Sequence, residues 1–283
     1  MKFIAFQKPY WILLVLITSL MSMVANAIEP PRIVSTDAGA TEILLALGQG
    51  ANLVGVDVTS KVPKPFTPEV VGYHRNLSAE GLMSLRPSNV FGSEHIGPKE
   101  AITALKRANT SFLLLPSAKT PAGLIENIEG IASALALSPN TLVNQVNQRS
   151  ELLNKTLTEI TQHQNQSKIV FLLYLQGRGM QQAGEGTTGD ALIKLLNGKN
   201  LAEFKNYRAV APEALLSMQP DVILVASESD YAPNDLLKQH PVLSHTPAGK
   251  QSKILYVDAR SLVSGISLSA MDEAVRLTGE LSK

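Results

Sequence analysis

The sequence predicts an α/β fold of two lobes, each built around a parallel sheet, with one long bridging α-helix and a ligand cleft between the lobes. Three observations support this fold class. Short apolar runs alternate with helical patterns on both sides of the middle of the chain. The middle has no strand signal and keeps a helical spacing from Pro139 to about Gln164. A short motif also occurs once in each half, at positions 79–87 and 212–220.

The first 27 residues are expected to be a cleaved secretory signal peptide and not part of the fold. Lys2 and Lys8 make the start positive, and an apolar run follows at 11–24. It is too short and wrongly flanked for a stable membrane span. Residues 25–27 (Ala-Asn-Ala) form a small-x-small cleavage pattern. We expect the mature chain to begin at Ile28 and to be soluble outside the inner membrane.

Composition excludes several functions. The chain has no cysteine, so we do not expect a lipoprotein, and thiolate metal sites and cysteine nucleophiles are excluded. Without the signal peptide it has 23 basic and 24 acidic residues and no basic run, so nucleic acid is not an expected partner. No nucleophile elbow, phosphate-binding loop or catalytic carboxylate cluster is present, which favours a binding protein over an enzyme. A periplasmic enzyme that uses the same cleft is the alternative from another class.

The first lobe is predicted for residues 28–138. Apolar runs indicate buried strands at 32–35, 52–56, 88–91 and 111–115, and helical patterns lie at 41–47, 79–85 and 98–108. Alternating strands and helices favour a parallel sheet with helices on both faces, because a parallel connection needs a crossover.

One long helix is expected within residues 139–166. Its apolar residues recur about every 3.5 positions, with Ser150 in the one gap: Val143, Val146, Leu153, Leu157 and Ile160. At about 1.5 Å per residue this helix is roughly 35–40 Å long. Its other side is polar, as in a helix that lies across a surface.

The second lobe is predicted for residues 167–283, with strands at 169–175, 222–225 and 254–257 and helices at 188–196 and 267–281. AEGLMSLRP at 79–87 aligns with PEALLSMQP at 212–220. Each is an acidic helix start, an apolar helix and a proline, followed by a strand. The offset from Glu80 to Glu213 is 133 residues, too long for a solenoid repeat and suited to two similar lobes.

These features resemble the periplasmic substrate-binding proteins for cobalamin and iron chelates, whose two Rossmann-like lobes are joined by a rigid helix. The resemblance covers the mature chain and includes RIVSTDAGATEILLALG at 32–48. GYHRNLSAEGLMSLRP at 72–87 and AGEGTTGDALIKLLNG at 183–198 are similar to the haem-binding proteins of bacterial haem-uptake ABC transporters. The resemblance implies a monomer in the periplasm of a Gram-negative bacterium. It would capture ferric haem b as transported ligand, without a catalytic cofactor, and deliver it to an inner-membrane ABC permease.

In the haem subgroup, the tyrosine of the first motif is the axial ligand of the iron; here it is Tyr73. Phenolate is a hard anionic ligand that suits ferric iron. If residues 73–77 are extended, Arg75 lies on the side of Tyr73 and His74 on the other. Arg75 then supports the phenolate or pairs with a propionate. By spacing alone Tyr73 reads as a packing tyrosine, and only the motif favours the ligand role.

Three other segments are expected near the cleft, because loops at the carboxyl ends of parallel strands face it. His95 is a candidate second axial ligand or a polar wall. Arg178 is a candidate propionate partner, because guanidinium pairs bidentately with carboxylate. Gly184–Gly189 matches GxGxxG but lies eight residues beyond its strand. We therefore expect a tight turn that leads into a cleft-lining helix, and not a dinucleotide site.

Glu80 and Glu213 occupy equivalent places in the two repeats. An acid in the first turn of a helix is ordinary, because the helix dipole favours it. In the family that the chain resembles, such a pair docks onto arginines of the permease, and matched acids suit a two-fold partner. The alternative cargo on the same fold is cobalamin or a ferric siderophore. Tyr73 discriminates, because a siderophore brings its own iron ligands.

Overall fold

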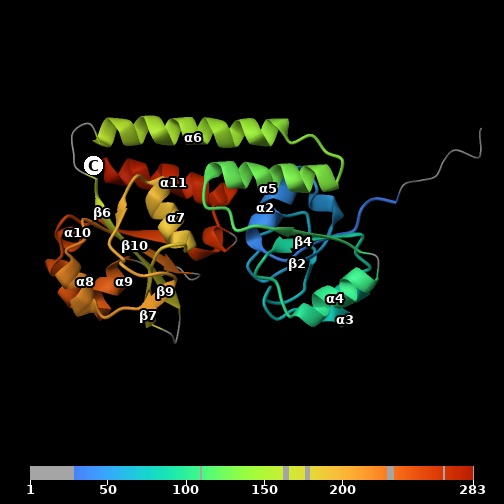
Figure 1. The fold of residues 1–283 in the computed structure, drawn as a ribbon, viewed down its shortest axis with the longest axis horizontal. Coiled ribbons are helices and arrows are strands. Elements are labelled where there is room, and N and C mark those ends of the chain that lie inside the picture. Colours follow the sequence, from blue (N-terminus) through green and yellow to red (C-terminus); the bar gives the residue numbers. More distant parts are fainter. Residues whose placement is uncertain are drawn as a thin grey trace, which may run out of the picture. The chain divides into compact units, whose positions relative to one another are not determined.

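The computed structural model describes residues 29–108, 110–161, 166–175, 179–227, 233–263 and 265–282. The predicted signal peptide and Arg178 lie outside these residues. Residues 32–283 form one compact unit, distinct from the first 31. Within this unit the chain builds two sheets, the first from β1 to β5 and the second from β6 to β11 (Figure 1). In the described part, no helix is long and apolar enough to cross a membrane. The predicted domain boundaries stay predictions.

The first sheet is parallel throughout, as predicted, in the order β3-β2-β1-β4-β5. Its strands are β1 (Ile33–Ser35), β2 (Leu53–Val56), β3 (Glu69–Val70), β4 (Asn89–Ser93) and β5 (Ser111–Leu115). The four predicted strands are therefore confirmed. The fifth, β3, has only two residues, and both are exposed, so it has no apolar run by which to recognise it.

Helices cover both faces of this sheet, because successive strand residues point to opposite sides. Ile33 packs in the cluster that contains Ile43 of α2, whereas Val34 packs with Leu82 of α3 and Leu105 of α4. The helices of this lobe are α2 (Ala38–Ala46), α3 (Ala79–Ser84), α4 (Lys99–Arg107) and α5 (Pro121–Ala134), with a 3-10 turn η1 (Gly50–Asn52).

Side-chain caps mark the start of two helices that the sequence analysis placed late or did not predict. Helix α2 begins three residues before the predicted start, because the Asp37 carboxylate accepts a hydrogen bond from the Ala40 N–H at 2.8 Å. Helix α5 was not predicted. The Thr120 hydroxyl caps it by accepting from the Gly123 N–H at 3.2 Å, and Pro121 occupies its first turn.

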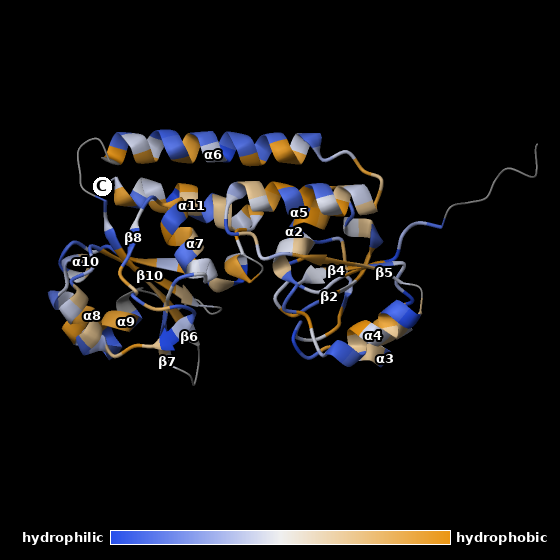
Figure 2. Cartoon of the chain, in the orientation of Figure 1, coloured by the Kyte–Doolittle hydropathy of each residue, from blue (hydrophilic) through white to orange (hydrophobic). Residues whose placement is uncertain are grey.

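The predicted long helix is confirmed as α6 (Asn140–Thr161). It packs on α5 of the first lobe and on α11 (Leu268–Leu281) of the second. Val146 and Leu153 are fully buried in the core that these helices share, and Arg149 Nε donates to Asp272 Oδ1 of α11 at 2.6 Å. Figure 2 shows β4 and β10 as hydrophobic, whereas α6 carries both hydrophobic and hydrophilic residues along its length.

The second sheet has the order β11-β10-β6-β7-β9, and β8 also pairs with β6. Strand β10 is parallel to β6 and β11, but β7 is antiparallel to both β6 and β9. The predicted parallel pairing therefore holds for β11, β10, β6 and β8, and the antiparallel pairs of β7 make the second sheet mixed. Only three residues connect β6 to β7, too few for a crossover. The strands are β6 (Lys168–Leu175), β7 (Gly179–Ala183), β8 (Lys199–Asn200), β9 (Tyr207–Ala209), β10 (Val222–Ser227) and β11 (Ile254–Asp258).

The two predicted helices of this lobe are confirmed as α7 (Thr188–Leu195) and α11. The second copy of the repeat forms α8 (Pro212–Met218) before β10, as the first forms α3 before β4. Shorter elements complete the lobe: α9 (Pro233–Gln239), η2 (Pro241–His245), α10 (Pro247–Lys250) and η3 (Ala259–Leu262).

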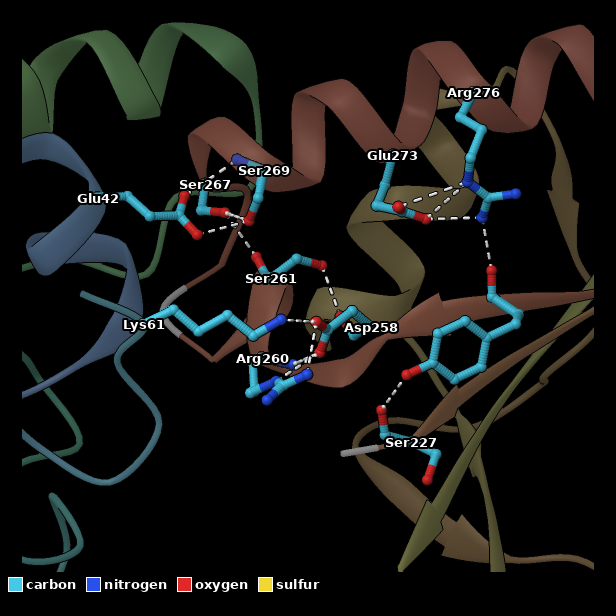
Figure 3. A network of polar contacts seen from close by, with 11 residues as sticks. Glu42, Lys61, Ser227, Asp258, Arg260, Ser261, Ser267, Ser269, Glu273 and Arg276 are labelled. Carbon is cyan, nitrogen blue, oxygen red and sulfur yellow. Dashed lines mark hydrogen bonds and ion pairs between the residues drawn. The ribbon is translucent and has the colours of Figure 1, made fainter. Parts of the chain in front are cut away.

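Polar contacts join the lobes on the side of α11 (Figure 3). The Glu42 carboxylate of α2 accepts hydrogen bonds from the Ser269 N–H at 3.0 Å and the Ser269 hydroxyl at 2.6 Å. Burial raises the pKa of Glu42. Lys61 of the first lobe donates to Asp258 of the second at 2.9 Å, and the Nε of Arg260 donates to the same carboxylate at 2.9 Å.

The Asp258 carboxylate makes a testable contribution to the stability of the fold. Burial alone would raise the pKa of Asp258, but hydrogen bonds from Arg260 and Lys61 lower it from 3.8 to about 2. Since the folded pKa is the lower one, the stabilisation is complete above pH 4 and is lost as the pH falls through 2. We expect Asp258→Asn to lower the free energy of unfolding by about 1–2 kcal/mol at pH 7.

Urea unfolding of both proteins at pH 7, 4, 3 and 2 measures this effect. The difference in unfolding free energy between wild type and Asp258→Asn should shrink toward the lowest pH. A difference that stays constant over this range would show that the ion pair contributes nothing through its charge.

Candidate ligand-binding site

A cavity of about 580 Å³ lies between the two lobes, within the size range of small-molecule sites. Loops at the carboxyl ends of strands form much of its wall. The first lobe contributes polar and aromatic groups: Thr59, Tyr73, His74, Arg75, Glu94, His95 and Lys119. The second lobe contributes a mixed surface that includes Phe171, Gln181, Thr188, Asn206, Tyr207 and Leu262.

The segment with Tyr73 is a turn and not the extended strand considered above. The Asn76 N–H donates to the Tyr73 carbonyl at 2.8 Å, and the Gly97 N–H donates to the His74 carbonyl at 2.9 Å. The turn follows Gly72, whose φ of 103° favours glycine. Tyr73 is 45% exposed, His74 is buried and Arg75 is exposed, and all three line the cavity.

Buried polar contacts hold this turn in place. His74 Nδ1 lies 3.3 Å from Asp57 Oδ2 and donates to it, because a carboxylate only accepts. Thr59 and Ser60 donate to the same carboxylate at 2.7–2.9 Å. The His74 ring lies 4.2 Å from the Tyr73 ring, centroid to centroid. The buried pair therefore supports the base of the exposed tyrosine.

His95 lies on the same wall, two residues after β4. Burial lowers the pKa of His95; Glu94 opposes this effect, and Arg75 and Lys119 reinforce it. The neutral imidazole, which has a free nitrogen lone pair, is thus favoured. Sequence reasoning missed Lys119, for which the only available signal was its position shortly after the predicted strand at 111–115. Among the described residues, no group of three or more His, Cys, Asp or Glu side chains could hold a metal ion.

The glycine-rich segment forms the expected turn and helix on the second-lobe wall. Gly186 has a φ of 82°, and the Thr187 hydroxyl caps α7 by accepting from the Asp190 N–H at 3.1 Å. Gly186, Thr187 and Thr188 all line the cavity. Tyr207, which sequence reasoning also missed, lies with its hydroxyl 3.3 Å from the Thr188 hydroxyl, and burial raises its pKa.

Glu80 and Glu213 do not line the cavity. Both are exposed, and each lies in the first turn of its helix, α3 or α8. The two glutamates thus keep equivalent places in the two repeats of the fold. Neither belongs to the cavity wall that contains Tyr73.

Two α/β lobes around a cleft, joined by a long helix, define a two-lobed ligand-binding protein. The chain matches the family model described as "Periplasmic binding protein" over residues 33–261, and it belongs to this family.

Solved structures agree with this assignment. The chain is similar to the periplasmic haem-binding protein HutB of Vibrio cholerae, with 34% identity, coverage of 89% of this chain and 99% of that one, and a TM-score of 0.79. A periplasmic haem-binding protein from Pseudomonas aeruginosa gives 28% identity, 89% and 92% coverage, and a TM-score of 0.81. These matches confirm the predicted two-lobed fold class.

The chain is also similar to the vitamin B12-binding protein of Vibrio cholerae, with 25% identity over 213 residues, 74% of this chain and 75% of that protein. It spans from 63% to 75% of the length of the curated relatives that it matches.

Proposed function

We propose that this chain is the periplasmic substrate-binding protein of a haem-uptake ABC transporter, which captures ferric haem and delivers it to an inner-membrane permease. The observation that carries this proposal is Tyr73, an exposed tyrosine in the wall of an inter-lobe cavity. The similarity to two haem-binding structures supports the same ligand.

The first-lobe wall suits ferric haem chemically. Tyr73 is the proposed axial ligand, because a phenolate oxygen binds ferric iron and cations nearby favour the phenolate. Arg75, on the same turn, is the proposed source of that charge or the partner of a propionate. His95 lines the cavity in a form that has a free lone pair, and it serves as a second axial ligand or as a polar wall. The proposed role of Arg178 stays a prediction from sequence.

Glu80 and Glu213 are the proposed docking residues for the permease. Both are exposed on equivalent helices of the two lobes, and neither lines the ligand cavity. A pair of acids placed in this way suits electrostatic registration on a two-fold partner. We propose that the protein acts in the periplasm as a monomer.

Cobalamin is the second candidate ligand, favoured by the vitamin B12-binding relative. A ferric siderophore is a further alternative, and an enzyme in the same cleft is not supported by the binding-protein family. Titration of the purified protein with ferric haem, followed by visible absorption, tests the proposal.

We expect saturable binding of ferric haem with a phenolate-to-iron charge-transfer band and no displacement by a large excess of cyanocobalamin. Ferric haem in the same buffer without protein serves as a control for non-specific changes in the spectrum. Displacement of haem by cobalamin, or the absence of saturable haem binding, would contradict the proposal.

A further inference from the structure

The first-lobe wall of the cavity contains a second cationic side chain besides Arg75, that of Lys119. Lys119 lies where the two lobes meet. Ala118 forms a parallel bridge with Gly265, and the Ile266 N–H donates to the Ala118 carbonyl at 2.7 Å. Lys119 follows directly, before the Thr120 cap of α5. Contacts on both sides therefore fix the backbone from which the Lys119 side chain enters the cavity.

The ammonium of Lys119 has no carboxylate partner within 4.0 Å among the described residues. Its hydrogen bond is to the neutral Ser117 hydroxyl, at 3.0 Å. Burial lowers the pKa of Lys119, while Glu94 and Asp190 oppose this effect from a distance. A partly desolvated cation without an ion pair is costly, and an anionic ligand group would offset that cost.

Asp190, the carboxylate in the adjoining cavity, already accepts hydrogen bonds from other groups of the protein. This second cavity, of about 480 Å³, shares Lys119 with the first and contains Asp190. Asp190 accepts hydrogen bonds from the Gly186 N–H at 3.1 Å, from Lys194 at 2.8 Å and from Asn200 at 3.0 Å. With these three donors in place, Asp190 does not neutralise Lys119.

Arg75 is the other cation on this wall, and the described residues place no carboxylate within ion-pair distance of it. Arg75 and Lys119 both lower the pKa of His95, so both charges lie near that imidazole. The opposing carboxylate of the wall is Glu94, which accepts from the Ser117 N–H at 3.3 Å. The first-lobe wall thus presents two cations and one anion to the ligand.

We propose that Lys119 is a specificity-determining residue that binds an anionic group of the ligand, so that Arg75 and Lys119 together select a ligand with two carboxylates. This inference rests on the proposed function, in which the two groups are the propionates of haem. Such a pair of cations would also favour haem over cobalamin, because the corrin ring carries neutral amides at its periphery where haem has two carboxylates. A guanidinium and an ammonium would each make a charge-assisted hydrogen bond to one carboxylate.

The test compares Lys119→Gln, Lys119→Arg and wild type for binding of ferric protoporphyrin IX and of its dimethyl ester, in the same dilute detergent. The ester keeps the iron and the ring but has no carboxylate charge. We expect Lys119→Gln to weaken binding of the free acid about tenfold, which corresponds to about 1.4 kcal/mol, and to leave binding of the ester unchanged. Lys119→Arg should retain most of the affinity, because it keeps the positive charge.

Lys106→Gln is the matched control, since Lys106 is exposed in the last turn of α4 and does not line the cavity. It should bind both porphyrins like wild type. Equal affinity of wild type and Lys119→Gln for the free acid would overturn this inference and leave the proposed function intact. An equal loss for acid and ester would also overturn it, because a merely structural role predicts that result. A wild-type protein that binds neither porphyrin would overturn both.

Discussion

Replacement of Tyr73 by phenylalanine is expected to abolish the phenolate-to-iron charge-transfer band of the haem complex. We also expect haem affinity to fall by roughly 100-fold or more, since even groups that only support a metal ligand contribute roughly 10- to 100-fold. The substitution removes one hydroxyl and keeps the ring that packs on His74. Tyr73 is 45% exposed, so the fold should be retained. Visible absorption and a haem titration measure both effects.

Tyr207→Phe is the matched control for this experiment. Tyr207 lines the same cavity, but burial raises its pKa, so its phenol stays protonated and does not supply a phenolate. The variant should keep the charge-transfer band of wild type. If Tyr73→Phe kept the band, or Tyr207→Phe lost it, the assignment of Tyr73 as axial ligand would be wrong. Equal thermal unfolding of the three proteins would exclude a loss of fold as the cause.

The parallel strands and the long helix could be predicted because their own residues carry the pattern. Strand β10 is a continuous apolar run, and α6 repeats its apolar residues on one side. The strands that were missed carry no such pattern. Strand β7 reads GMQQA, and its antiparallel pairing follows from the short connection to β6. Helix α5 was missed although its Thr120–Pro121 start is a recognisable signal.

The candidate site was less predictable, because contacts between distant segments form it. A family motif pointed to Tyr73, and in the fold Tyr73 lines the cavity. Apart from its place shortly after a predicted strand, nothing in the local sequence marks Lys119, and nothing marks Tyr207. Lys119 reaches the cavity because Ala118 bridges to Gly265, and Tyr207 does so through a strand that pairs with β7. Such pairings depend on tertiary structure, which spacing along the chain does not encode.

The buried pair of Asp57 and His74, which lies beside Tyr73, could not be predicted from the sequence either. The sequence places Asp57 and His74 17 positions apart, with no pattern that links them. The parallel pairing of β2 with β1 and β3 brings the end of β2 next to the turn that follows β3. His74 then donates to Asp57, and its ring packs on Tyr73. A motif can therefore point to a candidate ligand residue, whereas the groups that hold that residue in place become visible only in the fold.

Charge reversal of both repeat acids, Glu80→Lys with Glu213→Lys, is expected to reduce stimulation of the cognate transporter's ATPase by roughly tenfold or more. Like charges would then face the proposed arginines of the permease, and such contacts cost several kcal/mol. Haem affinity should stay near the wild-type value, because neither residue lines the cavity. Stability should fall by at most ~2 kcal/mol for the pair, the loss of two favourable charge–dipole interactions at helix starts. Transporter in membrane vesicles and a parallel haem titration measure the two effects.

Glu100→Lys is the matched control, because Glu100 is an exposed acid in the first turn of α4 that has no counterpart in the repeat. It makes the same charge change at the same kind of helix position, so it should stimulate the transporter like wild type. Graded loss in the order wild type, single variant, double variant would indicate that each lobe contributes its own contact. Full stimulation by the double lysine variant would reject docking and leave both acids as ordinary helix starts. Loss of haem binding in that variant would instead show that the two residues act on the ligand cavity, since a docking residue has no reason to change haem affinity in the absence of the permease.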